Sequence, residues 1–131
     1  VDRRAHFFRF QQQLTAALHE AGVPLLAGTD TPYPLLVPGF SLHHELEALV
    51  EAGLTPLAAL RTATLNAGRF FGDDAGVGVA REGARADLLV VEADPLGGPG
   101  ALREPWAVVR GGRWLDRAAL DRLLEEAAPG G

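Results

Sequence analysis

Hydrophobic residues recur every three or four positions over residues 3–21. The apolar positions are Phe7, Phe10, Leu14 and Leu18. This spacing, followed by Gly22, predicts an amphipathic helix that ends at the glycine. Residues 23–27 form a short apolar run instead, which is typical of a strand buried on both faces of a parallel sheet. We therefore expect a helix that leads directly into a strand.

A loop and two further helices are predicted after this strand. Residues 31–39 contain three prolines and a glycine, a composition that favours a loop of fixed shape. Ser41 is expected to cap a helix with one apolar stripe. Thr55 and Pro56 then predict the N-cap and the first residue of a second helix, which continues to about Phe70.

The pattern changes after Gly72, where glycines multiply and short β-rich runs appear. Strands are predicted at residues 86–91, 107–109 and 113–115. Gly111 and Gly112 separate the last two runs and predict a hairpin. A final amphipathic helix is expected over residues 116–127, with Asp116 as its cap. The pattern divides the chain into residues 1–72, 73–115 and 116–131.

Composition excludes several classes of function. A hydrophobic content of 47% with 22% charged residues is that of a globular chain, and the absence of cysteine excludes disulfides and thiolate metal sites. The net charge is −5 and the arginines are scattered, so we do not expect nucleic acid as a partner. No apolar stretch approaches the roughly 20 residues of a membrane span. We expect a cytoplasmic protein without a membrane partner.

Asp30 is the first candidate for chemistry. It follows Gly28 and Thr29 directly after the predicted strand at residues 23–27. In barrels of alternating strands and helices, the C-terminal ends of the strands collect catalytic and metal-binding groups around one cavity. The alternative is an aspartate that braces its own loop, because Asp is also favoured in turns for its side-chain hydrogen bonds.

Short motifs in a fixed order connect these segments to a known family. They are Gly28-Thr29-Asp30, Pro38-Gly39-Phe40-Ser41-Leu42-His43 with Glu45-Leu46, Ala52-Gly53-Leu54-Thr55-Pro56 with Ala59-Leu60, Ala63-Thr64 with Asn66, Gly76-Val77, Gly83 with Ala86-Asp87-Leu88, and Asp94-Pro95-Leu96. In this order they resemble the C-terminal third of a metal-dependent hydrolase of the amidohydrolase superfamily. The most similar members are the imidazolonepropionase-like and dipeptidase-like enzymes. The resemblance covers nearly the whole chain.

The resemblance implies an α/β fold. This would be the C-terminal part of a TIM-like (β/α)8 metal-dependent hydrolase barrel, followed by part of a small composite β-sandwich domain and a C-terminal helix. It also implies that Asp30 binds one or two divalent metal ions, usually zinc, and acts as a proton shuttle during hydrolysis of a carbon–nitrogen bond in a small-molecule substrate. A divalent cation lowers the pKa of bound water toward neutrality, and a nearby carboxylate can accept its proton.

The other metal ligands that the resemblance implies are absent from this chain. Such enzymes supply a His-x-His pair, a lysine carbamate or a glutamate, and two further histidines from earlier strands. The chain has no lysine, and its four histidines are His6, His19, His43 and His44. A zinc site needs three or four protein ligands, and a closed barrel takes about 250 residues. We expect the C-terminal part of a longer enzyme, inactive alone, with the N-terminal part of the barrel as its partner.

Three further residues are candidates for the substrate pocket. Thr29 could orient the carboxylate of Asp30, or it could simply favour a strand end. Tyr33 could line the pocket or pin its loop to the body of the protein. His43 could contact substrate, or it could lie in a solvated first turn of its helix. A metal site built from Asp30, His43 and His44 is disfavoured, because adjacent helical residues point about 100° apart.

A second class of function stays open at this stage. The chain could be a non-catalytic piece that binds a partner by supplying a barrel segment in trans. Exposed strand edges and amphipathic helices would suit such a role. A gene remnant without function and a homo-oligomer are also compatible with the sequence.

Overall fold

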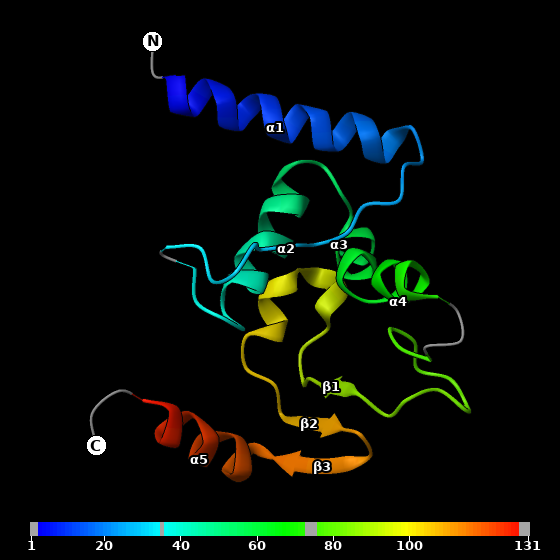
Figure 1. Cartoon of the computed structure of the whole chain (residues 1–131), viewed down its shortest axis with the longest axis vertical. Helices are drawn as coiled ribbons and strands as arrows, with labels where there is room; N and C mark the ends of the chain where they lie inside the picture. The colour runs from blue at the N-terminus through cyan, green and yellow to red at the C-terminus, as the bar shows by residue number, and fades with distance from the viewer. Residues whose placement is uncertain (1–2, 35, 73–75, 129–131) are drawn as a thin grey trace.

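The computed structural model describes residues 3–34, 36–72 and 76–128, a mixed arrangement of helices and strands. The elements are α1 (Arg3–Glu20), α2 (Ser41–Glu51), α3 (Pro56–Ala63), α4 (Leu65–Phe71), β1 (Leu88–Val90), η2 (Pro95–Gly97), η3 (Pro99–Leu102), β2 (Ala107–Arg110), β3 (Arg113–Asp116) and α5 (Arg117–Ala127). They lie in three levels along the long axis of the molecule (Figure 1). Helix α1 is at one end, α2 to α4 are in the middle, and the sheet with α5 is at the other end. The predicted boundary at 72/73 adjoins residues 73–75, which lie outside the described residues.

Helix α1 confirms the predicted first helix and its glycine end. Gly22 has a φ of 75° and donates to the carbonyl of His19 at 2.9 Å, while Val23 donates to Leu18 at 3.0 Å. These bonds satisfy carbonyls that the end of a helix leaves free. None of the described residues of α1 is buried. The apolar stripe that predicted the helix therefore faces outward, with Phe7 60% exposed.

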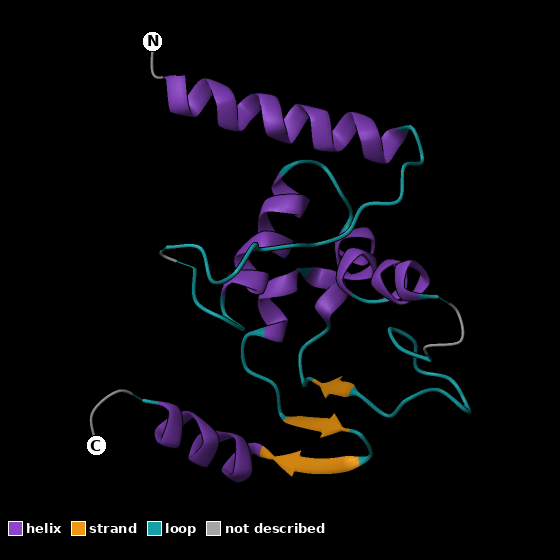
Figure 2. Ribbon diagram, viewed as in Figure 1, coloured by secondary structure: helices purple, strands orange, loops and turns teal. Residues whose placement is uncertain are grey.

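The predicted strand at residues 23–27 is wrong as a strand. The segment has no strand assignment and runs as a loop across the middle of the molecule (Figure 2). Two bonds tether it to α3 and α4: the amide of Ala27 donates to the carbonyl of Thr62 at 3.3 Å, and Asn66 Nδ2 donates to the carbonyl of Leu25 at 2.8 Å. A strand needs a neighbour to form its ladder. Within the described ranges no strand pairs with this segment, since β1, β2 and β3 pair only with one another.

The start of α2 corrects the predicted cap. Phe40 occupies the N-cap position, and Ser41 is already the first residue of the helix. The hydroxyl of Ser41 accepts a hydrogen bond from the backbone amide of Val37 at 2.8 Å, so it stabilises the preceding loop. Residues 31–34 and 36–39, where a loop was predicted, contain no helix or strand.

The second predicted helix is divided at Thr64. Thr55 caps α3 as expected, because its Oγ1 accepts from the amide of Ala58 at 3.2 Å, and Pro56 begins the helix. Thr64 then leaves helical geometry, with φ −126° and ψ −93°. Its hydroxyl donates to the carbonyl of Leu60 at 2.8 Å, a local bond that competes with the helical ladder. The result is two short helices, α3 and α4, where the spacing predicted one.

The three predicted strands form an antiparallel sheet in the order β1-β2-β3. Gly111 and Gly112 have φ values of 56° and 81°, as a two-residue turn with left-handed positions requires, and the predicted hairpin is confirmed. Arg110 pairs with Arg113 at the end of the ladder next to the turn. The ring of Trp106 meets that of Trp114 edge to face at 5.6 Å. No further strand pairs with the outer edges of β1 and β3 within the described part of the chain.

The C-terminal helix follows β3 without a loop. Asp116 ends the strand and caps α5, since its Oδ1 accepts from the amide of Ala119 at 2.8 Å. The helix contacts β3 and β2. Residues 129–131 of the predicted tail lie outside the described part. Among the described residues, the buried hydrophobic core residues are few and belong to the middle level and the sheet: Leu46, Leu54, Ala59 and Ala107.

Candidate functional site

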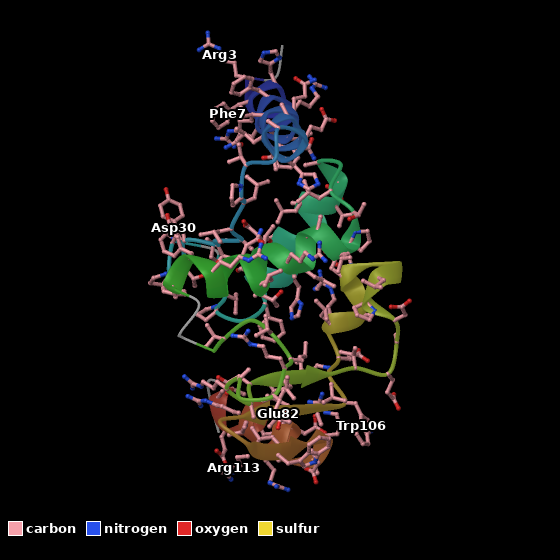
Figure 3. All side chains as sticks on the ribbon, turned by 90° about the vertical axis from the view of Figure 1, so that its right-hand side faces the viewer. Arg3, Phe7, Asp30, Glu82, Trp106 and Arg113 are labelled. Atoms are coloured by element: carbon pink, nitrogen blue, oxygen red, sulfur yellow. The ribbon has the colours of Figure 1, made fainter. Side chains whose placement is uncertain are left out.

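Asp30 lies in a tight turn that directs its carboxylate outward. Its φ is 54°, a left-handed conformation that Asp tolerates better than most residues. Its carbonyl accepts from the amide of Tyr33 at 3.0 Å, which closes the turn. The residue is exposed and lies at mid-height of the molecule, well away from Trp106 of the sheet region (Figure 3). The turn therefore presents the carboxylate to a ligand without a competing ion pair among the described residues.

Threonine hydroxyls and a glutamate hold this turn in place. Thr29 Oγ1 and Thr31 Oγ1 are 2.5 Å apart and share a hydrogen bond across Asp30. Glu45, on α2, accepts from the amide of Gly28 at 3.1 Å. Sequence reasoning did not name Glu45 as a site residue, although the Glu45-Leu46 motif contained the signal. Thr29 thus braces the turn through Thr31, and Glu45 fixes the start of the turn to α2.

Tyr33 does not pin the loop by burial. Its side chain is 67% exposed, while its carbonyl accepts from the amide of Leu36 at 3.0 Å. The backbone of Tyr33, and not its ring, organises this part of the loop. The exposed ring is free to contact a molecule that approaches Asp30.

His43 belongs to a different part of the molecule from Asp30. It lines a cavity of about 340 Å³ that α5 and the segment after η3 also line, and that cavity includes none of Asp30, Thr29 or Tyr33. Its Nδ1 atom is buried and has no hydrogen-bond partner among the described residues. The neighbouring His44 is exposed. The fold therefore brings Thr29 and Tyr33 together with Asp30 but places His43 elsewhere.

The environment of His43 favours its neutral form. Burial lowers the pKa of the imidazole below its ordinary value, and the positive charge of Arg103 lowers it further. Glu47 acts in the opposite direction, and His44 adds a small lowering effect. A neutral imidazole offers one donor and one acceptor, and the buried Nδ1 forms no hydrogen bond with the described residues.

The described residues do not fit a complete metal site. Among residues 3–34, 36–72 and 76–128, no group of three or more His, Asp or Glu side chains could hold a metal ion. Asp30, His43 and His44 are accordingly not gathered around one point. Asp30 could supply one ligand, and a zinc ion needs three or four.

No helix in the described part of the chain combines the length and apolar character needed to cross a membrane. The longest, α1, has 18 residues but is interrupted by polar and charged side chains.

Comparison with known proteins gives consistent matches. The sequence profile described as the amidohydrolase family matches residues 10–120. Ochratoxinase from Aspergillus niger is 39% identical over 113 residues, 82% of this chain and 22% of that protein. The crystal structure of a candidate prolidase from Bifidobacterium longum superposes with a TM-score of 0.71 at 39% identity, covering 86% of this chain and 29% of the other. Phenylurea hydrolase B matches with a TM-score of 0.69 at 29% identity, covering 82% and 27%.

The matched region takes in most of this chain but a small part of each relative. The chain spans 22% to 29% of the length of these relatives. The match includes the Asp30 turn, the helices α2 to α4 and the three-stranded sheet. The resemblance in the ordered motifs is thereby confirmed, and the chain belongs to the amidohydrolase family.

Proposed function

We propose that this chain, within its full-length protein, contributes Asp30 to metal-dependent hydrolysis of a carbon–nitrogen bond other than an ordinary peptide bond. The observation that carries this proposal is the exposed carboxylate of Asp30, held in a left-handed turn by the bond between Thr29 and Thr31. The names ochratoxinase and phenylurea hydrolase, carried by relatives, support hydrolysis of a small molecule.

In this proposal Asp30 has two tasks. Asp30 would supply one ligand to a divalent metal, most simply zinc, whose other ligands would come from outside the described residues. The metal, when bound, lowers the pKa of water toward 7. The carboxylate of Asp30 accepts the proton of the attacking water as the oxygen bonds to the substrate carbon. It then delivers that proton to the nitrogen as the carbon–nitrogen bond breaks.

The proposal assigns roles to the three units of the chain. Residues 1–72 are the last part of a TIM-like barrel, with residues 23–27 as its final strand once a neighbouring strand pairs with them. Residues 73–115 are part of a small β-sandwich domain, and residues 116–131 are the C-terminal helix and tail. The N-terminal part of the barrel is the principal partner. Assembly into a homo-oligomer is compatible with this arrangement.

Thr29 and Tyr33 have supporting roles beside Asp30. The hydroxyl bond between Thr29 and Thr31 limits the motion of the turn, which keeps the carboxylate oriented. The exposed ring of Tyr33 is positioned on the same loop to contact substrate. The substrate contact of His43 stays a prediction, because His43 lines a separate cavity.

The test is the Asp30→Asn variant of the protein expressed from its complete reading frame. Asn adopts left-handed backbone readily, so the turn should survive the substitution. Hydrolysis of N-acyl amino acids and aryl ureas should fall by about 10²- to 10⁴-fold, the usual contribution of a positioned proton-transfer group. Metal content, measured by mass spectrometry, should also fall. Asp94→Asn is the matched control, because Asn can replace Asp94 as the cap of η2.

Wild-type hydrolysis and metal content in Asp30→Asn would contradict the assignment of Asp30. Equal losses in Asp94→Asn would point to a general effect on folding instead of the chemistry of one carboxylate.

A non-catalytic, partner-binding piece is the second candidate function. The observation that favours it is α1, whose described residues are all unburied and whose apolar stripe is exposed. Separate expression of this chain and of the N-terminal barrel part, followed by mixing, distinguishes the two functions. A stable complex that never hydrolyses any C–N substrate would favour the second candidate.

A further inference from the structure

Helix α2 holds the loop that carries Asp30 at two points. Near the start of the loop, the backbone amide of Gly28 donates to Oε1 of Glu45 at 3.1 Å. Near its end, the amide of Val37 donates to the hydroxyl of Ser41 at 2.8 Å. Ser41 and Glu45 are four residues apart in α2, so they lie on the same face of the helix. One helix face therefore fastens both ends of the loop.

The bond to Glu45 is the one close to the proposed chemistry. Gly28 precedes Asp30 by two residues, whereas Val37 follows it by seven. Only Thr29 stands between the bonded amide and the left-handed backbone of Asp30. Each residue has only two soft backbone dihedrals, so a displacement of Gly28 reaches the carboxylate with little attenuation. A displacement of Val37 can be absorbed by the longer stretch of loop.

Glu45 has no competing partner among the described residues. Its carboxylate is partly buried, and the hydrogen bonds and ion pairs of the described part of the chain connect it only to Gly28. Glu47, on the same helix, is instead paired with Arg103. An ionised carboxylate is acceptor-only and forms stronger hydrogen bonds with a backbone amide than a neutral group does. The side chain of Glu45 is thus committed to the turn.

Helix α2 gives this anchor a rigid base. Leu46, the residue after Glu45, is 2% exposed and belongs to the buried core, and Ser41 is buried as well. The helix contacts α1, α3 and η3. A side chain on a packed helix holds its partner more precisely than one on a loop. The position of the Gly28 amide is therefore set by the core of the middle level.

We propose that Glu45 is a positioning residue for Asp30, because its bond to the amide of Gly28 fixes the direction in which the turn presents the carboxylate. The bond between Thr29 and Thr31 closes the turn, and Glu45 fastens the closed turn to α2. Glu45 acts through the backbone and touches neither substrate nor metal. This inference rests on the proposed function, since it assigns Glu45 a role in the proton transfer of Asp30.

Loss of the bond should affect the rate more than the binding of substrate. Proton transfer needs the carboxylate within hydrogen-bond reach of the proton, and a misplacement of 1 Å can lower a rate about 100-fold. Without Glu45, the turn stays closed by its threonines but is no longer fastened to the helix. The carboxylate then spends less time in the productive direction, so kcat falls while KM changes little.

The first test needs neither substrate nor metal. Hydrogen exchange is measured on the protein expressed from its complete reading frame, in Glu45→Ala, Glu45→Gln and the control Glu51→Ala, whose residue is exposed at the end of the same helix. Exchange at the amide of Gly28 should become roughly 10-fold faster in Glu45→Ala. It should stay close to the wild-type rate in Glu45→Gln, whose side-chain oxygen accepts the same bond, and in Glu51→Ala. The amide of Ala52, bonded to Ala48, reports whether α2 stays folded.

The second test compares kcat for the N-acyl amino acid or aryl urea that the wild type hydrolyses fastest. Glu45→Ala should lower kcat roughly 10- to 100-fold with KM near the wild-type value. Glu45→Gln should recover most of this loss, and Glu51→Ala should match the wild type. A purely structural role would not give this recovery together with an unchanged exchange rate at Ala52.

Three results overturn the positioning role. One is wild-type exchange at Gly28 in Glu45→Ala, as would occur if a neighbouring strand of the full-length protein held that amide. The others are equal losses of kcat in Glu45→Ala and Glu45→Gln, and faster exchange at Ala52 together with Gly28.

Asp30→Asn separates this inference from the proposed function. If Asp30→Asn loses hydrolysis while Glu45→Ala keeps it, the positioning role fails alone. If Asp30→Asn keeps wild-type hydrolysis, the proposed function fails, and the positioning role fails with it.

Discussion

Arg103 and Glu47 are 56 residues apart in the chain and form a two-point ion pair, with Nε to Oε1 at 3.1 Å and Nη2 to Oε2 at 2.7 Å. The pair joins the segment after η3 to α2, and so connects the middle of the molecule to the part that leads into β2. It also sets the position of the Arg103 guanidinium, which lines the same cavity as His43.

This ion pair should contribute modestly to stability. Its side chains are 37% and 36% exposed, so solvent screens the attraction between them. A double-mutant cycle with Arg103→Gln and Glu47→Gln, measured by urea unfolding, should give a small stabilising coupling energy that falls with added salt. The more exposed pair of Arg117 and Asp121 is the comparison and should couple less. A coupling near zero at low salt would contradict the prediction.

The pH dependence of stability should carry a contribution from His43. Its pKa is lowered from the ordinary value of 6.5, first by burial and then by Arg103. Below pH 6.5 the unfolded chain therefore binds a proton that the folded chain resists. The contribution of His43 to the free energy of unfolding should be fully present above about pH 6.5. It should be lost as the pH falls toward the lowered pKa of His43 in the folded protein. Unfolding curves of His43→Gln should lack this decline.

Glu47 should cause a second loss of stability, at a lower pH than the loss that His43 causes. Its hydrogen bond from Arg103 lowers the pKa of the carboxyl below 4.5. The contribution of Glu47 to stability is present above about pH 4.5 and is lost as the pH falls through its pKa in the folded protein. Glu47→Gln should therefore remove this loss of stability at low pH and keep the loss that His43 causes at higher pH. Identical pH profiles for the two variants would rule out this division.

Gly68 should resist substitution because α4 approaches the segment at residues 77–78 closely. A Cβ at Gly68 would clash with the carbonyl oxygen of Val77, and one at Gly78, where φ is +77°, would clash with the carbonyl oxygen of Thr64. Gly68→Ala should lower the free energy of unfolding by about 1–3 kcal/mol, as overpacking does. Gly97→Ala is the control, since a Cβ there meets nothing within 4 Å. Equal thermal stabilities of the two variants would contradict the close approach.

As the cap of α5, Asp116 should contribute about 1 kcal/mol to the free energy of unfolding. Asp116→Ala removes the acceptor for the amide of Ala119, whereas Asp116→Asn retains one. In chemical unfolding, Asp116→Asn should therefore have a free energy of unfolding close to that of the wild type, and Asp116→Ala a lower one than both. If Ala and Asn were equally destabilised, the charge of Asp116 and not its capping bond would be responsible.

Asn66 should control the order of the segment that leads to Asp30. Its Nδ2 donates to the carbonyl of Leu25, and Asn66→Asp replaces that donor by an acceptor of the same shape. Hydrogen exchange at the amide of Ala27, which donates to Thr62 nearby, should become faster. The amide of Ala59, bonded to Thr55 within α3, serves as an internal reference and should not change.

Local chemistry predicted those features whose partners lie close in sequence. Thr55 and Asp116 cap helices because each needs only an amide three residues ahead, and the double glycine turns its hairpin because the geometry is confined to two residues. Ser41 shows the limit of such reasoning. Its hydroxyl found an amide four residues earlier, at Val37, and a cap motif does not distinguish the two directions.

Features that depend on residues far away in the chain could not be predicted from the sequence. Residues 23–27 have the composition of a strand, but a strand forms only beside another, and none pairs with them in the described part. The site was divided for a similar reason. Asp30 and His43 belong to neighbouring motifs in the sequence. In the structure, however, His43 faces α5 and the segment after η3, which lie 60 residues or more further along the chain.

The outward stripe of α1 has a consequence for how mutations in this region should be interpreted. Phe7 and its neighbours add little to the stability of the described chain, because none of the helix is buried (Figure 3). A deep mutational scan scored on folding of the 131 residues alone would rate these positions as tolerant. Under the proposed arrangement, the same scan scored on activity of the full-length protein should rate them as intolerant as core positions. The difference between the two scores would map the surface on which the proposed N-terminal part of the barrel packs.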